Sequence, residues 1–378
     1  MIRNSILFSK IKVGNVFVEN RFMRSATWEK LADEDGYPTK PLFDQMIKYS
    51  KGECGLIIPG FMHTLSSGIS AEKQTGCFTK KHCDMWKDTI KQIQNNGSKI
   101  VFQLVHGGGH CTESLSHHQP ITPSGITKGT RAIKESEIDE VIESFIRSAK
   151  NFQQVGADGI QIHCAHGTLL SDFISPILNQ RTDKYGGSVR NRARIIHEII
   201  AGIREVTNDS FIVGIKIMGE EFVKGGMNPK LCVETVKELP KLDFIEASCT
   251  DPRYVSRSIY NEDLIRRNSK IAEQIIPIAK KMTEGIPFIE GYNLPQAILL
   301  KKAFPSTVVA CVGGWKHADK MEEAVKSGEI DMISLSRPFF KDPYLVKHLK
   351  EGAKEVQCEF CSLCALSPDG PIRCRNWI

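Results

Sequence analysis

Short apolar runs alternate along the chain with segments that show the spacing of amphipathic helices. The strand candidates are residues 21–26, 55–59, 99–105, 159–163, 212–218, 243–248, 307–312 and 331–336. Most are continuously apolar, which is typical of parallel strands covered on both faces. Helical patterns separate them, for example at 85–95, 138–154 and 317–326. This alternation predicts an α/β fold, a (β/α)8 TIM barrel with loop insertions.

No linker, low-complexity tract or break in composition divides the chain. We therefore expect a single barrel domain over residues 1–378, with a cysteine-containing tail at about 355–378. A ninth apolar run at 286–289 is interpreted as part of a long loop after the sixth strand, and the polar segments on either side are expected to cover the substrate. Functional groups of such a barrel gather at the C-terminal ends of its strands.

The composition is that of a globular protein with a solvated surface. Hydrophobic residues make up 41% and charged residues 25%, an ordinary globular balance. Lys10 and Lys12 interrupt the first apolar stretch, so we expect a cytoplasmic protein without a signal peptide. The net charge of +6 is spread over the chain, which is typical of a solvated surface. We expect a small-molecule substrate, no nucleic acid and no membrane, and a homo-oligomer stays open.

The fourth candidate strand delivers two histidines, His163 and His166, to its C-terminal end. Two imidazoles can donate hydrogen bonds to one carbonyl oxygen. Such donors stabilise developing enolate charge, so the β-carbon of an enone accepts hydride more readily. Zinc binding is an alternative, but no third histidine or carboxylate follows at a usual ligand spacing. A purely structural pair is the remaining interpretation.

The residues around this pair resemble a family motif. IH-x-AHG is followed by LL-x-x-F-x-SP-x-x-N-x-RTD-x-YGGS-x-x-NR-x-R. This pattern resembles the old yellow enzyme family of FMN-dependent ene-reductases. The resemblance implies a barrel that holds FMN and uses NADH or NADPH to reduce the activated C=C bond of α,β-unsaturated carbonyl compounds in a ping-pong reaction. It also implies that His163 and His166 are the catalytic residues.

One position departs from this pattern. Many members of the family carry a tyrosine directly after AHG as the acid that protonates the α-carbon, and here Thr168 stands in its place. Either water or another group then supplies the proton. The candidate replacements are Tyr185, Tyr254, Tyr260 and Tyr292. Arg181, Asp183 and Arg192 in the following loop are interpreted as scaffolding held by arginine–carboxylate bonds.

The resemblance also indicates where the flavin ring would lie. Ser25, Ala26 and Thr27, at the end of the first strand, would provide a flat backbone edge with small side chains. An ungapped count places Trp28, not Thr27, at the position that tunes the flavin potential in the family. Gly60 ends the second strand and permits close approach of a ligand, although an ordinary turn explains it equally well.

Two polar residues are expected at the pyrimidine edge of the flavin. Gln103 offers a donor and an acceptor together, with a buried structural glutamine as the alternative. Lys216 would stabilise the anionic reduced flavin, and a buried lysine without such a partner would be costly.

The phosphate of FMN is expected after strands seven and eight, where phosphate-binding barrels hold it. Gly313 and Gly314 would offer backbone N–H groups, and Arg337 would offer its guanidinium. The family usually has glycine before that arginine, where this chain has Ser336, whose amide can still bind phosphate.

Four of the twelve cysteines gather in the tail: Cys358, Cys361, Cys364 and Cys374. Such thiols could hold zinc or an iron–sulfur cluster, and larger relatives of the dienoyl-CoA reductase type carry a cluster in this region. Those relatives also have a nucleotide-binding domain, whereas no G-x-G-x-x-G fingerprint follows a strand here. The cysteine gaps are also tighter here. We therefore favour reduced structural cysteines and expect no metal.

Two alternatives to the ene-reductase hypothesis stay open. One is a dienoyl-CoA or tetrapyrrole-type reductase that takes electrons from another donor. The other is a flavin-binding barrel without catalytic activity, which the substitution at Thr168 favours.

Overall fold

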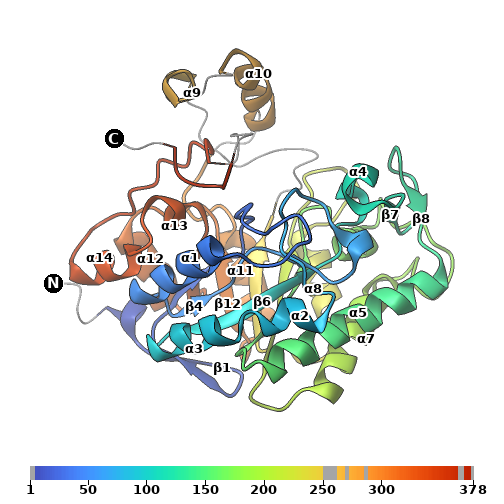
Figure 1. The fold of residues 1–378 in the computed structure, drawn as a ribbon, viewed down its shortest axis with the longest axis horizontal. Helices are drawn as coiled ribbons and strands as arrows, with labels where there is room; N and C mark the ends of the chain where they lie inside the picture. The colour runs from blue at the N-terminus through green and yellow to red at the C-terminus, as the bar shows by residue number, and fades with distance from the viewer. Residues whose placement is uncertain (1–4, 250–261, 269–271, 285–287, 365–369, 376–378) are drawn as a thin grey trace.

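The computed structural model describes residues 5–249, 262–268, 272–284, 288–364 and 370–375. Parallel strands close into a barrel that helices surround (Figure 1). In chain order the barrel strands are β3 (Phe22–Arg24), β4 (Leu56–Ile57), β6 (Lys99–Val105), β9 (Gly159–Cys164), β10 (Ile212–Met218), β11 (Phe244–Ser248), β12 (Val308–Val312) and β13 (Met332–Leu335). The pairing of β4 with β6 closes the ring. The predicted TIM barrel is confirmed, and each predicted strand overlaps one of these.

Helices follow the strands in the order that a (β/α)8 barrel requires. The longer ones are α1 (Lys40–Lys51), α3 (Lys87–Asn95), α5 (Glu135–Gln154), α7 (Val189–Val206), α8 (Pro229–Lys237), α11 (Leu294–Ala303), α12 (Ala318–Lys326) and α14 (Leu345–Glu351). The shorter ones are α2 (Lys80–Asp84), α4 (Glu113–Ser116), α6 (Leu169–Ile174), α13 (Arg337–Lys341) and the 3-10 turns η2 (Ile6–Phe8), η3 (Ser66–Gly68) and η4 (Gly108–His110).

Helix α5 shows why these segments form helices. Its apolar residues recur every three or four positions and are buried along one face, ending with Phe145 and Phe152. At its N-terminus Glu137 accepts the backbone N–H of Lys134 at 2.8 Å and pairs with Arg131. A carboxylate in the first turn interacts favourably with the helix dipole.

Two separate apolar cores hold the barrel together. The larger one lies between the strands and the surrounding helices. The smaller one fills the barrel interior near the N-terminal ends of the strands; we call five of its residues, Val101, Ile212, Phe244, Val308 and Met332, the lower layer. The antiparallel hairpin of β1 (Ile11–Val13) and β2 (Val16–Val18) covers this end with Val13 and Val18.

Phe244 is the largest residue of the lower layer, and a glycine on the next strand makes room for it. A Cβ on Gly214 of β10 would lie 2.1 Å from the Phe244 ring. Burying a phenylalanine contributes about 1.5–3 kcal/mol. The two residues therefore act as a matched pair at the closed end of the barrel.

The remaining elements lie outside the barrel. β5 (Met62–His63) pairs with β6, and β7 (Ile121–Thr122) pairs with β8 (Arg131–Ala132). Across the described ranges, none of the helices has the length and apolar character needed to cross a bilayer.

The segment after β11 differs from the expected loop. It contains two helices, α9 (Glu262–Asn268) and α10 (Ala272–Thr283), which stand away from the barrel body beside the C-terminal tail (Figure 1). Ile265 and Ile275 of these helices pack against Leu363 of the tail. Of the apolar run at 286–289, Phe288 and Ile289 form no regular element, in agreement with the prediction, and the rest lies outside the described residues.

Candidate functional site

Polar side chains replace apolar ones toward the C-terminal ends of the same strands. Because side chains alternate along a strand, the residue two positions after a lower-layer residue faces the same side. We call the upper layer the buried set Ser25, Gln103, Gln161, Lys216, Glu246 and Ser334. Lys216 lies opposite His163 in the β9–β10 ladder and opposite Glu246 in the β10–β11 ladder.

Glu246 is at the centre of the hydrogen bonds in the upper layer. Ser25 Oγ donates to Glu246 Oε1 at 2.5 Å, and Ser334 Oγ donates to the same oxygen at 2.8 Å. Lys216 Nζ donates to Ser25 Oγ at 2.8 Å and lies 3.4 Å from Glu246 Oε1. Burying a charge is expensive unless it is paired and hydrogen-bonded, and here both charges have partners.

A second branch of this network leads to Gln103. Gln161 Nε2 donates to Glu246 Oε2 at 2.8 Å, and Gln103 Nε2 donates to Gln161 Oε1 at 2.6 Å. The network therefore joins three residues that the sequence predicts at a flavin, namely Ser25, Gln103 and Lys216. Their relation to a flavin stays a prediction, but the structure brings them together.

The two predicted catalytic histidines lie beside this network. The rings of His163 and His166 are 5.2 Å apart between centroids, and His163 is only 4% exposed. His163 Nδ1 is buried and has no hydrogen-bond partner within the described residues. His166 has a φ of 61° and its Nε2 lies 2.9 Å from Ser248 Oγ. A left-handed residue two positions after the end of a strand turns the chain sharply, which brings the second ring back toward the first.

Burial sets the protonation of both imidazoles. It lowers the pKa of His166 to about 3, and it holds the pKa of His163 well below its usual value, with His166 and Lys216 adding to the effect. Both rings are therefore neutral near pH 7. A neutral imidazole has one N–H donor and one acceptor nitrogen, so each ring can donate one hydrogen bond to a ligand oxygen.

The structure narrows the search for a proton donor. The hydroxyl of Thr168 donates to the carbonyl of Ala165 at 3.0 Å. Tyr185 is part of the core, and its hydroxyl donates to Glu198 at 2.9 Å. Burial, followed by the nearby Glu198, raises the pKa of Tyr185, which makes it a poor acid. Of the other candidate tyrosines, Tyr254 and Tyr260 lie outside the described residues, so these two and Tyr292 stay candidates.

The loop after the histidines makes one of the predicted arginine–carboxylate bonds, and its role as a scaffold stays a prediction. Arg181 pairs with Asp183 and also donates to the carbonyl of Pro123 at 2.9 Å. Arg192 bonds backbone carbonyls rather than a carboxylate, among them that of Ile174 at 3.2 Å. The contacts of the loop therefore come from both carboxylates and the backbone.

The predicted cofactor residues Thr27 and Gly60, after β3 and β4, already form hydrogen bonds within the protein. Thr27 Oγ1 lies 2.5 Å from Ser336 Oγ, which brings the ends of β3 and β13 together beside Ala26. The backbone N–H of Gly60 donates to both carboxylate oxygens of Glu29, at 3.0 and 3.1 Å. A Cβ at Gly60 would lie 2.2 Å from that carboxylate. The glycine is therefore explained by Glu29.

Glu29 belongs to a buried ion pair that the sequence did not reveal. Arg24 Nη2 contacts Glu29 Oε1 at 2.8 Å, and Arg24 Nη1 donates to the carbonyl of Ile58 at 2.6 Å. Burial raises the pKa of Glu29, while the Arg24 charge and the Gly60 N–H act in the opposite direction.

The predicted phosphate-binding residues lie at the ends of β12 and β13. Gly314 has a φ of 67°, and a Cβ there would lie 2.6 Å from the ring of Phe288, so local geometry already requires glycine. A Cβ at Gly313 would lie 3.0 Å from the backbone nitrogen of Asn293. Ser336 directly precedes α13, whose first residue is Arg337.

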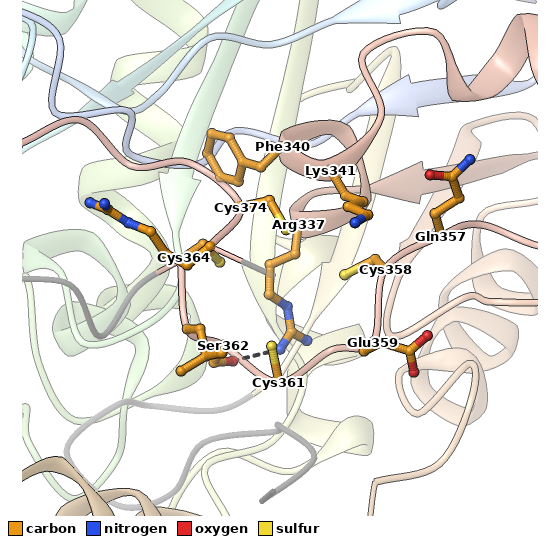
Figure 2. A pocket seen from close by; sticks show the side chains of 12 residues that line it. Arg337, Phe340, Lys341, Gln357, Cys358, Glu359, Cys361, Ser362, Cys364 and Cys374 are labelled. Atoms are coloured by element: carbon orange, nitrogen blue, oxygen red, sulfur yellow. Dashed lines mark hydrogen bonds between the residues drawn. The ribbon is translucent and has the colours of Figure 1, made fainter. Parts of the chain in front are cut away.

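Arg337 is directed toward the tail. Its Nη1 donates to Ser362 Oγ at 2.8 Å and to the carbonyl of Phe360 at 3.3 Å. Figure 2 shows the guanidinium between the cysteine loop and α13. A small cavity lies beside the guanidinium, and its lining includes Cys358, Cys361, Cys364 and Cys374.

The four cysteine side chains share one cavity but have different neighbours. Cys364 and Cys374 pack with Phe340 and Ile372, whereas Cys361 packs toward α9 and α10. Within the described residues, no three His, Cys, Asp or Glu side chains are arranged as a metal site. The interpretation as structural thiols stays a prediction.

The chemistry of the upper layer fits the flavin that the resemblance implies. A flavin edge carries carbonyl oxygens, a ring N–H and, when reduced, a negative charge. The buried ammonium of Lys216, the amide of Gln103 and the unpartnered Nδ1 of His163 match these groups in charge and hydrogen-bonding character.

Three members of the upper layer were not predicted from the sequence: Gln161, Glu246 and Ser334. Each is a polar residue within an apolar run, on the same face as a predicted site residue of a neighbouring strand. Reading every second position of each strand would have found them.

Comparisons with known proteins identify the family of the chain. The family model of the NADH:flavin oxidoreductase / NADH oxidase family matches residues 6–355. An NADH oxidase of Thermoanaerobacter brockii is 28% identical over 369 residues, which cover 94% of this chain and 53% of that protein. An NADPH dehydrogenase of Geobacillus sp. (strain WCH70) is 28% identical over 357 residues, 90% of this chain and 92% of that protein. The chain thus spans about half the length of the first relative.

Solved structures share the fold. A 2-naphthoyl-CoA reductase bound to 2-naphthoyl-CoA superposes with a TM-score of 0.83 at 25% identity, over 94% of this chain and 54% of that one. The old yellow enzyme homologue from Zymomonas mobilis gives a TM-score of 0.72 at 20% identity, over 93% and 94%. With the family model matching nearly the whole barrel, the chain belongs to the NADH:flavin oxidoreductase / NADH oxidase family of FMN-dependent oxidoreductases, which includes the old yellow enzymes.

Proposed function

We propose that the chain, as one FMN-binding unit over residues 1–378, uses NADH or NADPH to reduce electron-poor C=C bonds of α,β-unsaturated carbonyl compounds. FMN, when bound, supplies the hydride chemistry. The observation that carries this proposal is the neutral pair of buried His163 and partly exposed His166 beside the ammonium of Lys216 at one mouth of the barrel.

The upper layer would hold the ring edge of FMN. Lys216 would meet the edge that becomes negative on reduction, and Gln103 would bond the pyrimidine groups. The segment Ser25, Ala26 and Thr27 would lie along the ring. Because Lys216 and Gln103 are already held by Ser25 and Gln161, they would need little reorganisation to bind.

The remaining contacts would hold the phosphate of FMN. Gly313 and Gly314 would offer backbone N–H groups, and Ser336 and Arg337 would close the site at α13. Gly60 would contribute only its position near the ring, since its N–H serves Glu29. Arg337 would share its five N–H groups between phosphate and Ser362.

The histidine pair would bind the carbonyl oxygen of the substrate. Each neutral ring donates one hydrogen bond, and together they stabilise negative charge that develops on that oxygen. The proton for the α-carbon would come from water or from Tyr254, Tyr260 or Tyr292, because Thr168 and Tyr185 are both engaged elsewhere.

Reoxidation kinetics test this proposal. The protein is reduced with NADH or NADPH and mixed in a stopped-flow instrument with a panel of enones. We expect substrate-dependent reoxidation. His163→Ala should retain FMN but lose binding of phenolic ligands, which present an oxygen to the same pair. Reoxidation that does not depend on the enone would contradict the proposal and favour a non-catalytic flavin-binding barrel.

A second candidate function is favoured by the cysteine cavity. The 2-naphthoyl-CoA reductase is a CoA-thioester enzyme by name, and the four tail cysteines lie beside Arg337. A dienoyl-CoA or tetrapyrrole-type reductase fed by another electron donor would use these thiols for an iron–sulfur cluster. Iron and sulfide assays on protein purified without air, together with failure of NADH and NADPH to reduce the flavin, would support it.

A further inference from the structure

Glu246 is a buried charge for which the proposed reaction has no direct use. Three neighbouring groups donate to its carboxylate, namely Ser25 Oγ, Ser334 Oγ and Gln161 Nε2, at 2.5, 2.8 and 2.8 Å. A buried ion pair is often no more stabilising than well-packed apolar residues of similar volume. Phe244, two positions earlier on the same strand, shows that an apolar side chain fits this face. Stability alone therefore does not explain a glutamate here.

The carboxylate dictates the direction of the amide chain. Because an ionised carboxylate only accepts hydrogen bonds, Gln161 must turn its amide nitrogen toward Glu246. The amide oxygen of Gln161 then faces Gln103, which presents its own nitrogen at 2.6 Å. The carbonyl of Gln103 is consequently turned away from Gln161. A flavin carries an N–H between two carbonyls on its pyrimidine edge, and that N–H needs an acceptor of this kind.

The carboxylate also acts on the ammonium of Lys216. The two groups are 3.4 Å apart, and the hydroxyl of Ser25 bridges them by accepting from Lys216 and donating to Glu246. In a buried site, opposite charges at this separation offset each other strongly. Without this partner, the positive charge of Lys216 would not be compensated within the network. Lys216 would then favour an anionic ligand over a neutral one.

We propose that Glu246 is a positioning residue of the cofactor site, which orients the amide of Gln103 through Gln161 and moderates the charge of Lys216. The inference rests on the proposed binding of FMN at this mouth. It predicts that Glu246 sets both the affinity for FMN and the midpoint potential of the bound flavin, without touching the substrate.

The test compares Glu246→Gln with the unchanged protein. FMN is removed, binding is measured by titration of flavin fluorescence, and the midpoint potential of the loaded protein is measured against reference dyes. The amide of glutamine has a donor as well as an acceptor, so the amides of Gln161 and Gln103 can flip in this variant. Gln103 then no longer holds its carbonyl toward FMN. Oxidised FMN should bind about tenfold more weakly, the value of one hydrogen bond. Reduced FMN should gain about tenfold relative to oxidised FMN, a rise of about 30 mV for a two-electron couple.

Two further variants separate the effects. Ser334→Ala removes one hydrogen bond from the same carboxylate without changing the charge, and the potential should move by less than about 15 mV, a threefold ratio. The exchange Glu246→Gln with Gln161→Glu keeps one carboxylate in the network and again gives Gln103 an acceptor. It should restore the affinity for oxidised FMN, and it provides the test if Glu246→Gln alone does not fold.

The outcomes distinguish this inference from the proposed function. If the unchanged protein binds FMN but Glu246→Gln alters neither affinity nor potential, the role of Glu246 is wrong and the proposed function stands. If Glu246→Gln does not fold, a tenfold loss of affinity in the exchange variant overturns the orienting role. Failure of the unchanged protein to bind FMN would overturn both.

Discussion

The lower and upper layers of the barrel interior share most of their strands, where their residues are two or four positions apart, yet one layer is apolar and the other is polar. Phe244 of the lower layer packs into space left by Gly214, whereas Glu246 of the upper layer receives hydrogen bonds from two strands and from Ser25 directly after a third. The lower layer needs only shape and apolar area. The upper layer needs partners for each buried polar group, because an unpaired one costs about 1–3 kcal/mol. Stability and function are thus separated along the barrel axis.

The first and largest expected effect is acid destabilisation, which acts on the functional end and not on the lower layer. Burial lowers the pKa of His63 to about 4 and those of His106 and His166 to about 3, and that of His163 also lies far below its usual value. These imidazoles stay neutral when folded but protonate when unfolded. Stability is therefore complete above pH 6.5 and is lost as pH falls toward about 4. At pH 5 the loss is about 2 kcal/mol per histidine, or up to about 8 in total.

Urea unfolding at pH 7.5 and pH 5 measures this loss. Most carboxylates interfere little in this window, but the raised pKa of buried Glu29 acts in the opposite direction and reduces the loss. Glu137, whose pKa is lowered to about 2 mainly by its hydrogen bond with Arg131, loses its contribution only below its ordinary value of 4.5. Equal unfolding midpoints at the two pH values would show that the imidazoles are not buried as described.

The second prediction breaks the lower layer alone. Phe244→Ala should lower the free energy of unfolding by about 4 kcal/mol, because it leaves a cavity beside Gly214. Phe244→Leu should cost less than about 2 kcal/mol, since it keeps most of the volume. FMN affinity of the folded protein, measured by titration, should stay within about threefold, the scale of half a hydrogen bond. A large loss of FMN binding without loss of stability would contradict the separation of the two layers.

The third prediction breaks the upper layer. Lys216→Met leaves the carboxylate of Glu246 buried without its cation and should cost about 3 kcal/mol in the free energy of unfolding. The double variant Lys216→Met with Glu246→Gln removes both charges and should recover about 2 kcal/mol of that loss. Thermal or urea unfolding of the four proteins completes the cycle. Strict additivity would mean that the two groups are not coupled.

The smallest expected effect concerns Gly60 and tests whether this residue serves the buried ion pair or the ligand. Gly60→Ala places a methyl group 2.2 Å from the carboxylate of Glu29 and should cost about 2 kcal/mol by disturbing the buried pair with Arg24. Urea unfolding and FMN titration are measured together. Loss of FMN affinity with unchanged stability would instead assign Gly60 to the ligand, as the sequence suggested.

The sequence reveals the barrel well because buried parallel strands are continuous apolar runs, as in IVGIKIM at β10. It also reveals Lys216 and the histidine pair, which interrupt or end such runs. It does not reveal Glu246 as a partner, because Ser25, Gln161 and Glu246 are far apart in the chain and meet only through strand register.

The sequence motif also misleads at positions where contacts in the folded chain determine the role of a residue. Gly60, after β4, is a glycine because Glu29 approaches its backbone from the segment after the adjacent strand β3, where Arg24 holds it. Arg337 stands at the predicted strand end, yet its guanidinium bonds Ser362 of the tail. No periodicity or motif encodes such pairings, since they depend on contacts that form only in the folded chain.

The visible absorption spectrum of the purified protein, followed by titration of the flavin-free chain with FMN, tests the central claim most directly. We predict flavin bands and saturation at one FMN per chain, with His163→Ala retaining this binding. A colourless protein that does not take up added FMN would contradict the account.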